Sequence, residues 1–175
     1  PKSADDLRAF AARLAAGPAF LLLGRGEIDG GTPSVLYRWS GVYTTCVDDG
    51  VAEKFRTEWR TATSIGAMSS QPTRSETDLQ VRHLCGGVHL PDGEKPATDA
   101  LEEADARFRS AQELSRLASE TTTPRGVVVI AGWAPGDSLE PRDLIPALRP
   151  LGPGQVHLFS STIWAGDPFV ASLAQ

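Results

Sequence analysis

Short apolar runs recur along the chain, and two of them have the length of a single strand. Residues 19–23 and 126–131 are apolar almost throughout, which is typical of strands buried on both faces in a parallel sheet. The segment 61–80 is rich in Ser, Thr, Pro and Gly and predicts only short strands and loops. Weaker β-prone runs lie at 42–45, 81–85 and 155–160.

Segments with helical periodicity separate these runs. In the longest, 97–119, apolar residues from Leu101 through Phe108 to Leu117 recur on one side of a helix. Shorter helical patterns follow Ser3, cover 51–60 and begin near Pro141. Strands that alternate with helices indicate parallel βαβ units. The sequence therefore predicts one domain over residues 1–175, a three-layer Rossmann-like α/β fold with a mostly parallel central sheet.

Composition narrows the class of protein. The net charge is −5 and no run of Lys and Arg occurs, so the basic surface of a nucleic-acid-binding protein is not expected. No apolar run approaches the roughly 18 residues that a membrane span needs. Two cysteines are too few for the disulfide framework of a secreted domain, and no zinc ligand set is visible. We therefore expect a cytoplasmic protein. Because the chain starts at Pro1 and stops in a partly apolar segment, we expect it to be one domain of a longer protein.

A glycine-rich loop follows the first apolar run. It reads Gly24-Arg25-Gly26 and continues to a Gly-Thr-Pro turn that ends at Pro33. Backbone N–H groups in such a loop can hold a pyrophosphate, although a tight turn that leaves a strand has the same composition. The loop alone therefore leaves both interpretations open.

Three further motifs follow this loop in a fixed order. They are a Tyr-Thr-Thr-Cys segment that ends with Thr45 and Cys46, a strand that ends in Cys85 followed by glycine, and an apolar strand followed by Gly132 and Asp137. Together with the glycine loop, these motifs resemble the sirtuin-like family of NAD-binding domains, and the resemblance spans about residues 19–158. It implies that the glycine loop holds the pyrophosphate of NAD, that the family's asparagine orients water, and that its histidine is the general base.

The residues that this chemistry needs are replaced here. Cys46 stands at the asparagine position and Cys85 at the histidine position; a thiol, with a usual pKa near 8.5, is a poor substitute for an imidazole near 6.5. Glu27 and Asp29 place two negative charges beside the glycine loop. The connector of about ten residues after Pro33 is too short for the lid that covers the nicotinamide ribose in active relatives.

The sequence thus predicts an inactive sirtuin-like domain that serves as a structural or protein-interaction module of a larger bacterial protein, and relatives in antiviral defence proteins suggest that setting. Its partners would be neighbouring domains or another protein, and no cofactor is expected. One alternative is a non-catalytic sensor of NAD or ADP-ribose, supported by Arg25, and another is an active NAD glycohydrolase with a different base. We interpret His83 as structural and expect Asp137 to cap the helix behind it. The predicted vestigial site consists of Gly24, Arg25, Gly26, Thr45, Cys46, Cys85, Gly132 and Asp137.

Overall fold

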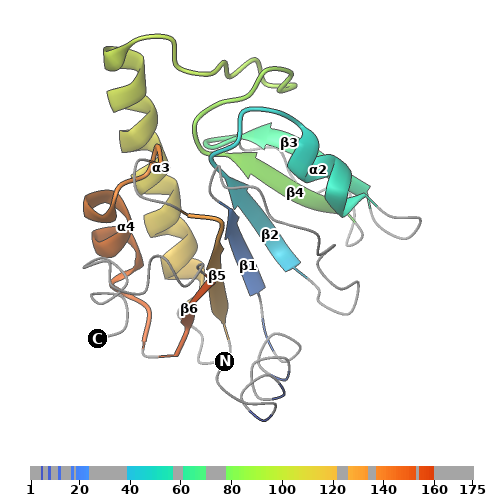
Figure 1. Ribbon diagram of the computed structural model, residues 1–175, viewed down its shortest axis with the longest axis vertical. Helices are drawn as coiled ribbons and strands as arrows, with labels where there is room; N and C mark the ends of the chain where they lie inside the picture. Colours follow the sequence, from blue (N-terminus) through green and yellow to red (C-terminus); the bar gives the residue numbers. More distant parts are fainter. Residues whose placement is uncertain are drawn as a thin grey trace.

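The described residues form a six-stranded sheet with helices on both of its faces, as the computed structural model shows (Figure 1). The structure describes residues 5, 8, 12, 17, 19–23, 39–56, 61–69, 78–121, 126–133, 137–152 and 154–159. The elements are β1 (Ala19–Leu23), β2 (Trp39–Thr44), α2 (Gly50–Phe55), β3 (Thr61–Gly66), β4 (Asp78–His83), α3 (Ala100–Glu120), β5 (Val127–Ala131), α4 (Pro141–Leu148) and β6 (Val156–Phe159). Most of the helix expected after Ser3 lies outside the described residues.

The sheet has the strand order β3-β4-β2-β1-β5-β6, and every neighbouring pair of strands is parallel. The chain places β2, β3 and β4 on one side of β1 and then crosses over to place β5 and β6 on the other side. The strand order therefore reverses between β1 and β5. In open parallel sheets, ligand sites gather at the carboxyl ends of the strands near such a reversal.

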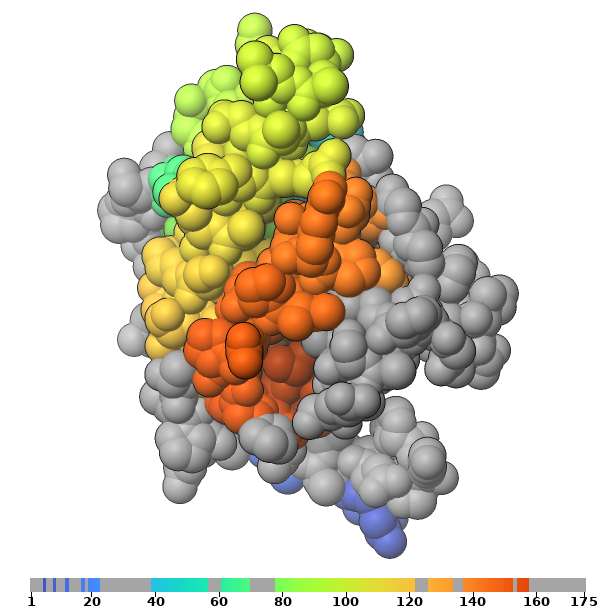
Figure 2. Space-filling model, turned by 90° about the vertical axis from the view of Figure 1, so that its left-hand side faces the viewer, coloured from blue at the N-terminus to red at the C-terminus, as the bar shows by residue number. Residues whose placement is uncertain are grey.

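Each central strand buries both of its faces, as the apolar runs predict. In β1, Phe20 and Leu22 belong to the core beneath α3 and α4, whereas Ala19 and Leu21 belong to the core beneath α2. The strand β5 divides in the same way, with Val128 on the α3 side. Figure 2 shows α3 in yellow and α4 in orange-red side by side on one flank of the molecule. The prediction of a layered α/β domain with a parallel central sheet is confirmed.

The strand β4 begins earlier than its apolar residues suggest. It starts at Asp78 rather than at residue 81, because polar partners satisfy its first carboxylate. Thr61 and Thr63 of the neighbouring β3 donate hydroxyl hydrogen bonds of 3.1 and 3.0 Å to Asp78 Oδ1. A sequence shows the buried polar residue but not the two hydroxyl groups that allow its burial.

The first half of α3 departs from the expected apolar face. Leu101 and Phe108 keep the apolar period but are 80% and 63% exposed, so this part of the apolar face does not join the core. The inward face instead includes Ser110, whose single hydroxyl proton is shared between two carbonyl groups, with Oγ 2.5 Å from Leu84 O and 2.7 Å from Ala106 O. Leu117 is fully buried, so the expected period holds only in the second half of the helix.

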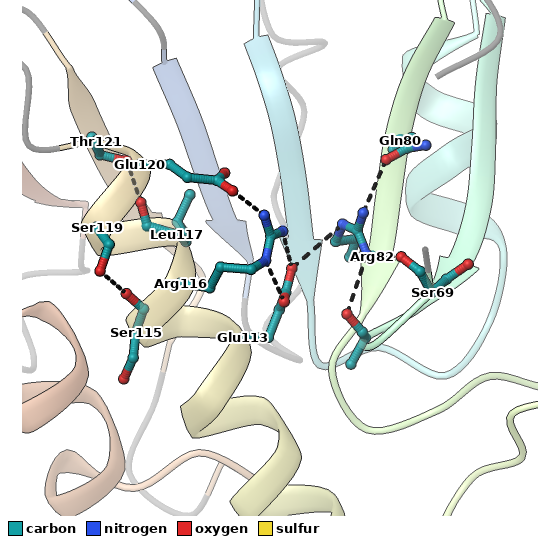
Figure 3. Close-up of polar contacts among 11 residues, drawn as sticks. Ser69, Gln80, Arg82, Glu113, Ser115, Arg116, Leu117, Ser119, Glu120 and Thr121 are labelled. Carbon is teal, nitrogen blue, oxygen red and sulfur yellow. Dashed lines mark hydrogen bonds and ion pairs between the residues drawn. The ribbon is translucent and has the colours of Figure 1, made fainter. Parts of the chain in front are cut away.

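A buried ion pair joins α3 to the sheet (Figure 3). Glu113 has a side chain only 4% exposed, and its Oε1 lies 3.5 Å from Arg82 Nε of β4. Arg82 also donates to Ala67 O at 3.2 Å and to Ser69 O at 2.9 Å, which ties it to the turn after β3. Arg116, one turn along α3, donates from Nε to Glu113 Oε2 at 2.9 Å. The carboxylate of Glu113 is thus held between two guanidinium groups.

Removal of this carboxylate is expected to destabilise the fold strongly. Glu113→Ala leaves the charge of Arg82 buried without its counter-ion, and loss of one partner of a buried pair costs about 3–5 kcal/mol. Glu120→Ala is the matched control, because Glu120 pairs with the same Arg116 but is half exposed, and such surface pairs contribute about 0–1 kcal/mol. Urea unfolding measures both changes. Equal losses in the two variants would contradict the assigned role of Glu113.

Tyr43 of β2 lies in the same core and reports on this charge. Burial, and secondly the charge of Glu113, raises the pKa of Tyr43 from 10.0 to about 12. The folded state therefore holds the phenolic proton more tightly than the unfolded state does. The contribution of Tyr43 to stability is full below pH 10.0 and is lost as the pH rises toward about 12.

Near-ultraviolet absorbance of tyrosinate can measure this titration. The chain has two tyrosines, so a Tyr37→Phe variant leaves Tyr43 as the only one. We expect ionisation only near pH 12, together with loss of the circular dichroism signal. Ionisation near pH 10 in a protein that stays folded would be inconsistent with a buried phenol.

Candidate functional site

A pocket of about 230 Å³ lies where the central strands reach their carboxyl ends. Its walls come from the loops after β2, β4 and β5 and from the first turns of α3. The lining residues are Val47, Cys85, Pro96, Ala97, Glu103, Ala106, Arg107, Asp137, Ser138 and Glu140. Figure 2 views the molecule from this flank, where the first turns of α3 and the segment that leads into α4 run next to each other. The pocket thus occupies the edge of the sheet where this class of fold binds ligands.

Hydrogen bonds join the loops that follow β2 and β4. Leu84 donates its N–H to Thr44 O at 2.8 Å, and Val88 donates to Val47 O at 2.9 Å. His83, at the end of β4, is fully buried and places Nδ1 2.8 Å from Cys46 O. That distance fits an Nδ1–H donor. His83 therefore holds the two cysteine-containing loops together, which agrees with a structural role, although its Nε2 has no partner in the described part of the chain.

The loop after β4 turns sharply behind Cys85. Gly86 has φ of 75°, and its N–H donates to His83 O at 3.4 Å. A Cβ atom at this position would lie 2.2 Å from the carbonyl oxygen of Lys95. Gly86 therefore lets the chain pass directly beneath residues 95–96, and this turn brings the thiol of Cys85 to the pocket wall.

The loop after β5 brings Asp137 to the same pocket. Gly132 leaves the strand with φ of 68°, and Trp133 then donates from its indole Nε1 to Leu139 O at 3.0 Å, which closes the loop. Asp137 is buried, and its Oδ1 accepts the N–H of Ser138 at 2.7 Å. The expected capping role of Asp137 is wrong, because α4 takes Glu140 as its N-cap.

Carboxylates outnumber basic groups in the pocket lining. Glu103, Asp137 and Glu140 face a single guanidinium, that of Arg107. Arg107 Nη1 lies 3.3 Å from Glu140 Oε1, and Arg142 approaches the other carboxylate oxygen of Glu140 at 2.9 Å. Glu103 is exposed at the mouth of the pocket and forms no ion pair with another described residue. Among the lining residues, carboxylates therefore outnumber guanidinium groups, and Glu140 is the carboxylate that two arginines approach.

The two helices that begin at this edge use their first N–H groups internally. In α3, Asp99 Oδ1 accepts from the N–H groups of Leu101 and Glu102, both at 2.9 Å. In α4, Pro141 at the first position has no N–H, and Asp143 Oδ2 accepts the N–H of Glu140 at 3.0 Å. Free N–H groups at a helix start are what hold a phosphate. Here the chain's own carboxylates take that place.

The structure brings two of the predicted site residues to one pocket, Cys85 and Asp137. Thr45 and Cys46 precede the lining residue Val47 on the β2 loop but do not line the pocket themselves. Thr45 is 2% exposed, and its hydroxyl has no hydrogen-bond partner among the described residues. Gly132 also lies outside the lining, and Gly24, Arg25 and Gly26 lie outside the described residues. Cys46 and Cys85 form no disulfide, and both lie on loops that follow adjacent strands.

Sequence reasoning missed the residues that the helices contribute. None of the three charged lining residues Glu103, Arg107 and Glu140 was singled out from the sequence. A general signal could have identified them. In a parallel sheet, each helix that follows a strand starts at the carboxyl edge, so charged residues in its first two turns are candidates for the site.

The fold and the position of the pocket define a Rossmann-like α/β protein. Comparisons with protein families, with curated proteins and with solved structures find no match to this chain. Among the described residues, no three or more His, Cys, Asp or Glu side chains are arranged to hold a metal ion. Within the same part of the chain, no helix has both the length and the apolarity needed to cross a membrane.

The turn behind Cys85 gives a testable prediction. Gly86→Ala adds a Cβ atom that both strains a backbone with φ of 75° and collides with Lys95 O, so we expect a loss of stability beyond the roughly 1–3 kcal/mol of strain alone. Gly93→Ala is the control, because Gly93 has φ of 77° but open space around the new Cβ. Thermal unfolding compares the two. If Gly86→Ala were no more destabilising than Gly93→Ala, the close approach of the two loops would be disproved.

Proposed function

We propose that this chain is a non-catalytic sirtuin-like domain that serves as a structural or protein-interaction module of a larger bacterial protein. The observation that carries the proposal is the acidic lining of the pocket at the carboxyl edge of the sheet, with Cys85 in its wall. The resemblance of the four sequence motifs supports the family, and through it a role in a defence or regulatory assembly.

The side chains that line the pocket support the absence of catalysis. The family's general base is an imidazole that takes a proton from a ribose hydroxyl, whereas this pocket presents the thiol of Cys85. A catalytic base must reach the proton and have a pKa near the operating pH. His83, at the end of β4, is fully buried and uses Nδ1 to hold the β2 loop, and neither His83 nor the exposed His89 is among the lining residues.

Charge and volume support the absence of a bound dinucleotide. The excess of carboxylates repels a pyrophosphate, and the helix starts at this edge are occupied by Asp99 and Asp143. Pockets that enclose drug-sized ligands measure roughly 300–1,000 Å³, whereas this pocket measures about 230 Å³. A dinucleotide is larger than such ligands, so the pocket suits a much smaller group.

Incubation with NAD tests the proposal. We expect no release of nicotinamide, measured by chromatography at micromolar concentrations of protein, because the pocket contains neither the base nor the charge that the reaction needs. A Cys85→Ala variant serves as the control for contaminating activity. Nicotinamide release by the unchanged protein that disappears in Cys85→Ala would refute the proposal and favour an active NAD glycohydrolase.

Calorimetry with NAD and with ADP-ribose tests the sensor alternative. We expect no binding tighter than millimolar, since the lining repels phosphate. A dissociation constant below about 10 μM that is lost in Arg25→Ala would replace the proposed interaction module with a nucleotide sensor.

A further inference from the structure

We propose that the exposed first half of α3 is a contact surface through which two copies of this domain pair, with their α3 helices packed antiparallel. The inference goes beyond the proposed function. It is carried by three properties of one helix: large apolar side chains that face solvent, an order of large and small residues that matches itself in reverse, and an acidic start followed by arginines.

Two large apolar side chains on α3 face solvent. Leu101 and Phe108 are 80% and 63% exposed. They are seven residues apart, so they lie on one line along the helix. Ala104 and Ala111 stand on the same line, the first exposed and the second half-buried. We call these four residues the apolar stripe, and their spacing of three and four residues is typical of a helix that packs against another helix.

The apolar stripe lies where a second molecule can reach it. Figure 1 shows the first turns of α3 extending past the ends of the strands, and Figure 2 shows the helix at the surface of one flank. Four large apolar residues are exposed in the described part of the chain, and two of them belong to this stripe. Apolar residues scattered singly over a surface are ordinary, whereas an aligned group indicates an interaction site.

The helix is held in place up to its first turn, so the stripe is ordered before a partner binds. Asp99 Oδ1 accepts the N–H groups of Leu101 and Glu102, both at 2.9 Å. Glu94, in the segment before α3, pairs with Arg109 at 2.9 Å and has a side chain only 15% exposed. A surface that is already ordered loses little conformational entropy on binding. This favours association even through a small contact.

The order of large and small residues along the stripe identifies a second copy as the partner. The gaps between its four residues are three, four and three, the same from either end. When two copies run antiparallel, Phe108 of one copy therefore comes level with Ala104 of the other, and Leu101 comes level with Ala111. Every large side chain then meets a small one, and the two helices can approach closely. The contact uses the same surface on both copies, so it closes as a two-fold dimer.

The charges beside the stripe favour the same orientation. Glu102 and Asp105 are exposed in the first two turns of α3, and a parallel pair would place these acidic starts side by side. In the antiparallel pair they lie beside the turn of the other copy that carries Arg107 and Arg109. Both arginines already pair with carboxylates of their own chain, at 3.3 and 2.9 Å. The charges therefore determine the orientation more than the affinity.

The size of the stripe predicts a weak dimer. A phenylalanine with the exposure of Phe108 offers about 100–150 Å² of apolar area. A single pair of helices buries less than the roughly 1,200 Å² at the lower limit of stable interfaces. We therefore expect a dissociation constant of about 10–500 μM.

Sedimentation equilibrium between about 10 μM and 1 mM measures the association. We expect the average mass to rise from 18.6 kDa toward twice that value. Phe108→Glu should weaken the dimer at least about ten-fold, because it places a charge in the apolar contact. Met68→Glu is the control, since it adds the same charge at a residue that is 52% exposed and lies outside α3. Circular dichroism verifies that both variants are folded.

Two results of this experiment would contradict the proposal. A mass that stays at 18.6 kDa throughout would overturn a second copy as the occupant of the stripe and point to a helix of another protein. An equal loss of association in Phe108→Glu and Met68→Glu would overturn α3 as the contact surface.

Methyl resonances determine the orientation of the two helices. Within one chain, Leu101 and Ala111 are ten residues of helix, or about 15 Å, apart, so they give no nuclear Overhauser effect. In the antiparallel dimer their methyl groups come into contact, and a sample that mixes labelled and unlabelled copies should show an intermolecular effect between them. An effect between Leu101 and its own counterpart in the second copy would indicate parallel helices and overturn the proposed arrangement.

The outcomes separate this inference from the proposed function. A monomer that neither consumes nor binds NAD would overturn the dimer and leave the non-catalytic domain standing. A dimer that turns over NAD would refute the proposed function and leave the contact through α3 standing.

Discussion

The pair of Glu113 and Arg82 is the constraint on which the placement of α3 depends. The chain leaves β4 and must cross β2 and β1 before it enters β5, and α3 makes that crossing. Apolar contacts alone would let a helix of 21 residues slide along the sheet. The buried carboxylate opposes such sliding, because any position other than the one beside Arg82 leaves that buried guanidinium without its counter-ion. The pair therefore fixes which residues of α3 lie over the sheet and which extend to the carboxyl edge.

Buried polar residues such as Glu113 explain which elements the sequence pattern predicted correctly and which it did not. Continuous apolar runs identified β1 and β5, since a strand buried on both faces needs nothing beyond hydrophobic side chains. The start of β4 and the inner face of α3 were harder to predict, because they bury Asp78, Ser110 and Glu113. Each of these is satisfied by a group far away in sequence, such as the hydroxyl of Thr61 on β3. Periodicity records polarity but not the partner that compensates it.

The candidate site could be predicted only as far as strand ends determine it. Cys85 and Asp137 lie far apart in the sequence, yet both follow strands of one parallel sheet, so their meeting at one edge was predictable. The contributions of Glu103 and Arg107 depend on how far α3 extends past the core, which the buried pair on its inner face sets. Leu101 and Phe108 follow the same apolar periodicity as Leu117, but they lie in the first half of α3, where that side of the helix is exposed. Periodicity alone therefore did not distinguish the buried half of the helix from the exposed half.

The polar groups at the carboxyl edge, rather than the fold, determine which N–H groups stay available there. A parallel sheet with two helices that start at one edge is the general architecture of phosphate recognition, because it offers N–H groups and positive helix ends. In this chain Asp99 and Asp143 occupy those positions, and Glu103, Asp137 and Glu140 add negative charge beside them. The carboxylates stabilise the helix starts and use the N–H groups that a phosphate would otherwise take. The same architecture can thus lose the N–H groups that hold a phosphate while the core of the fold stays unchanged.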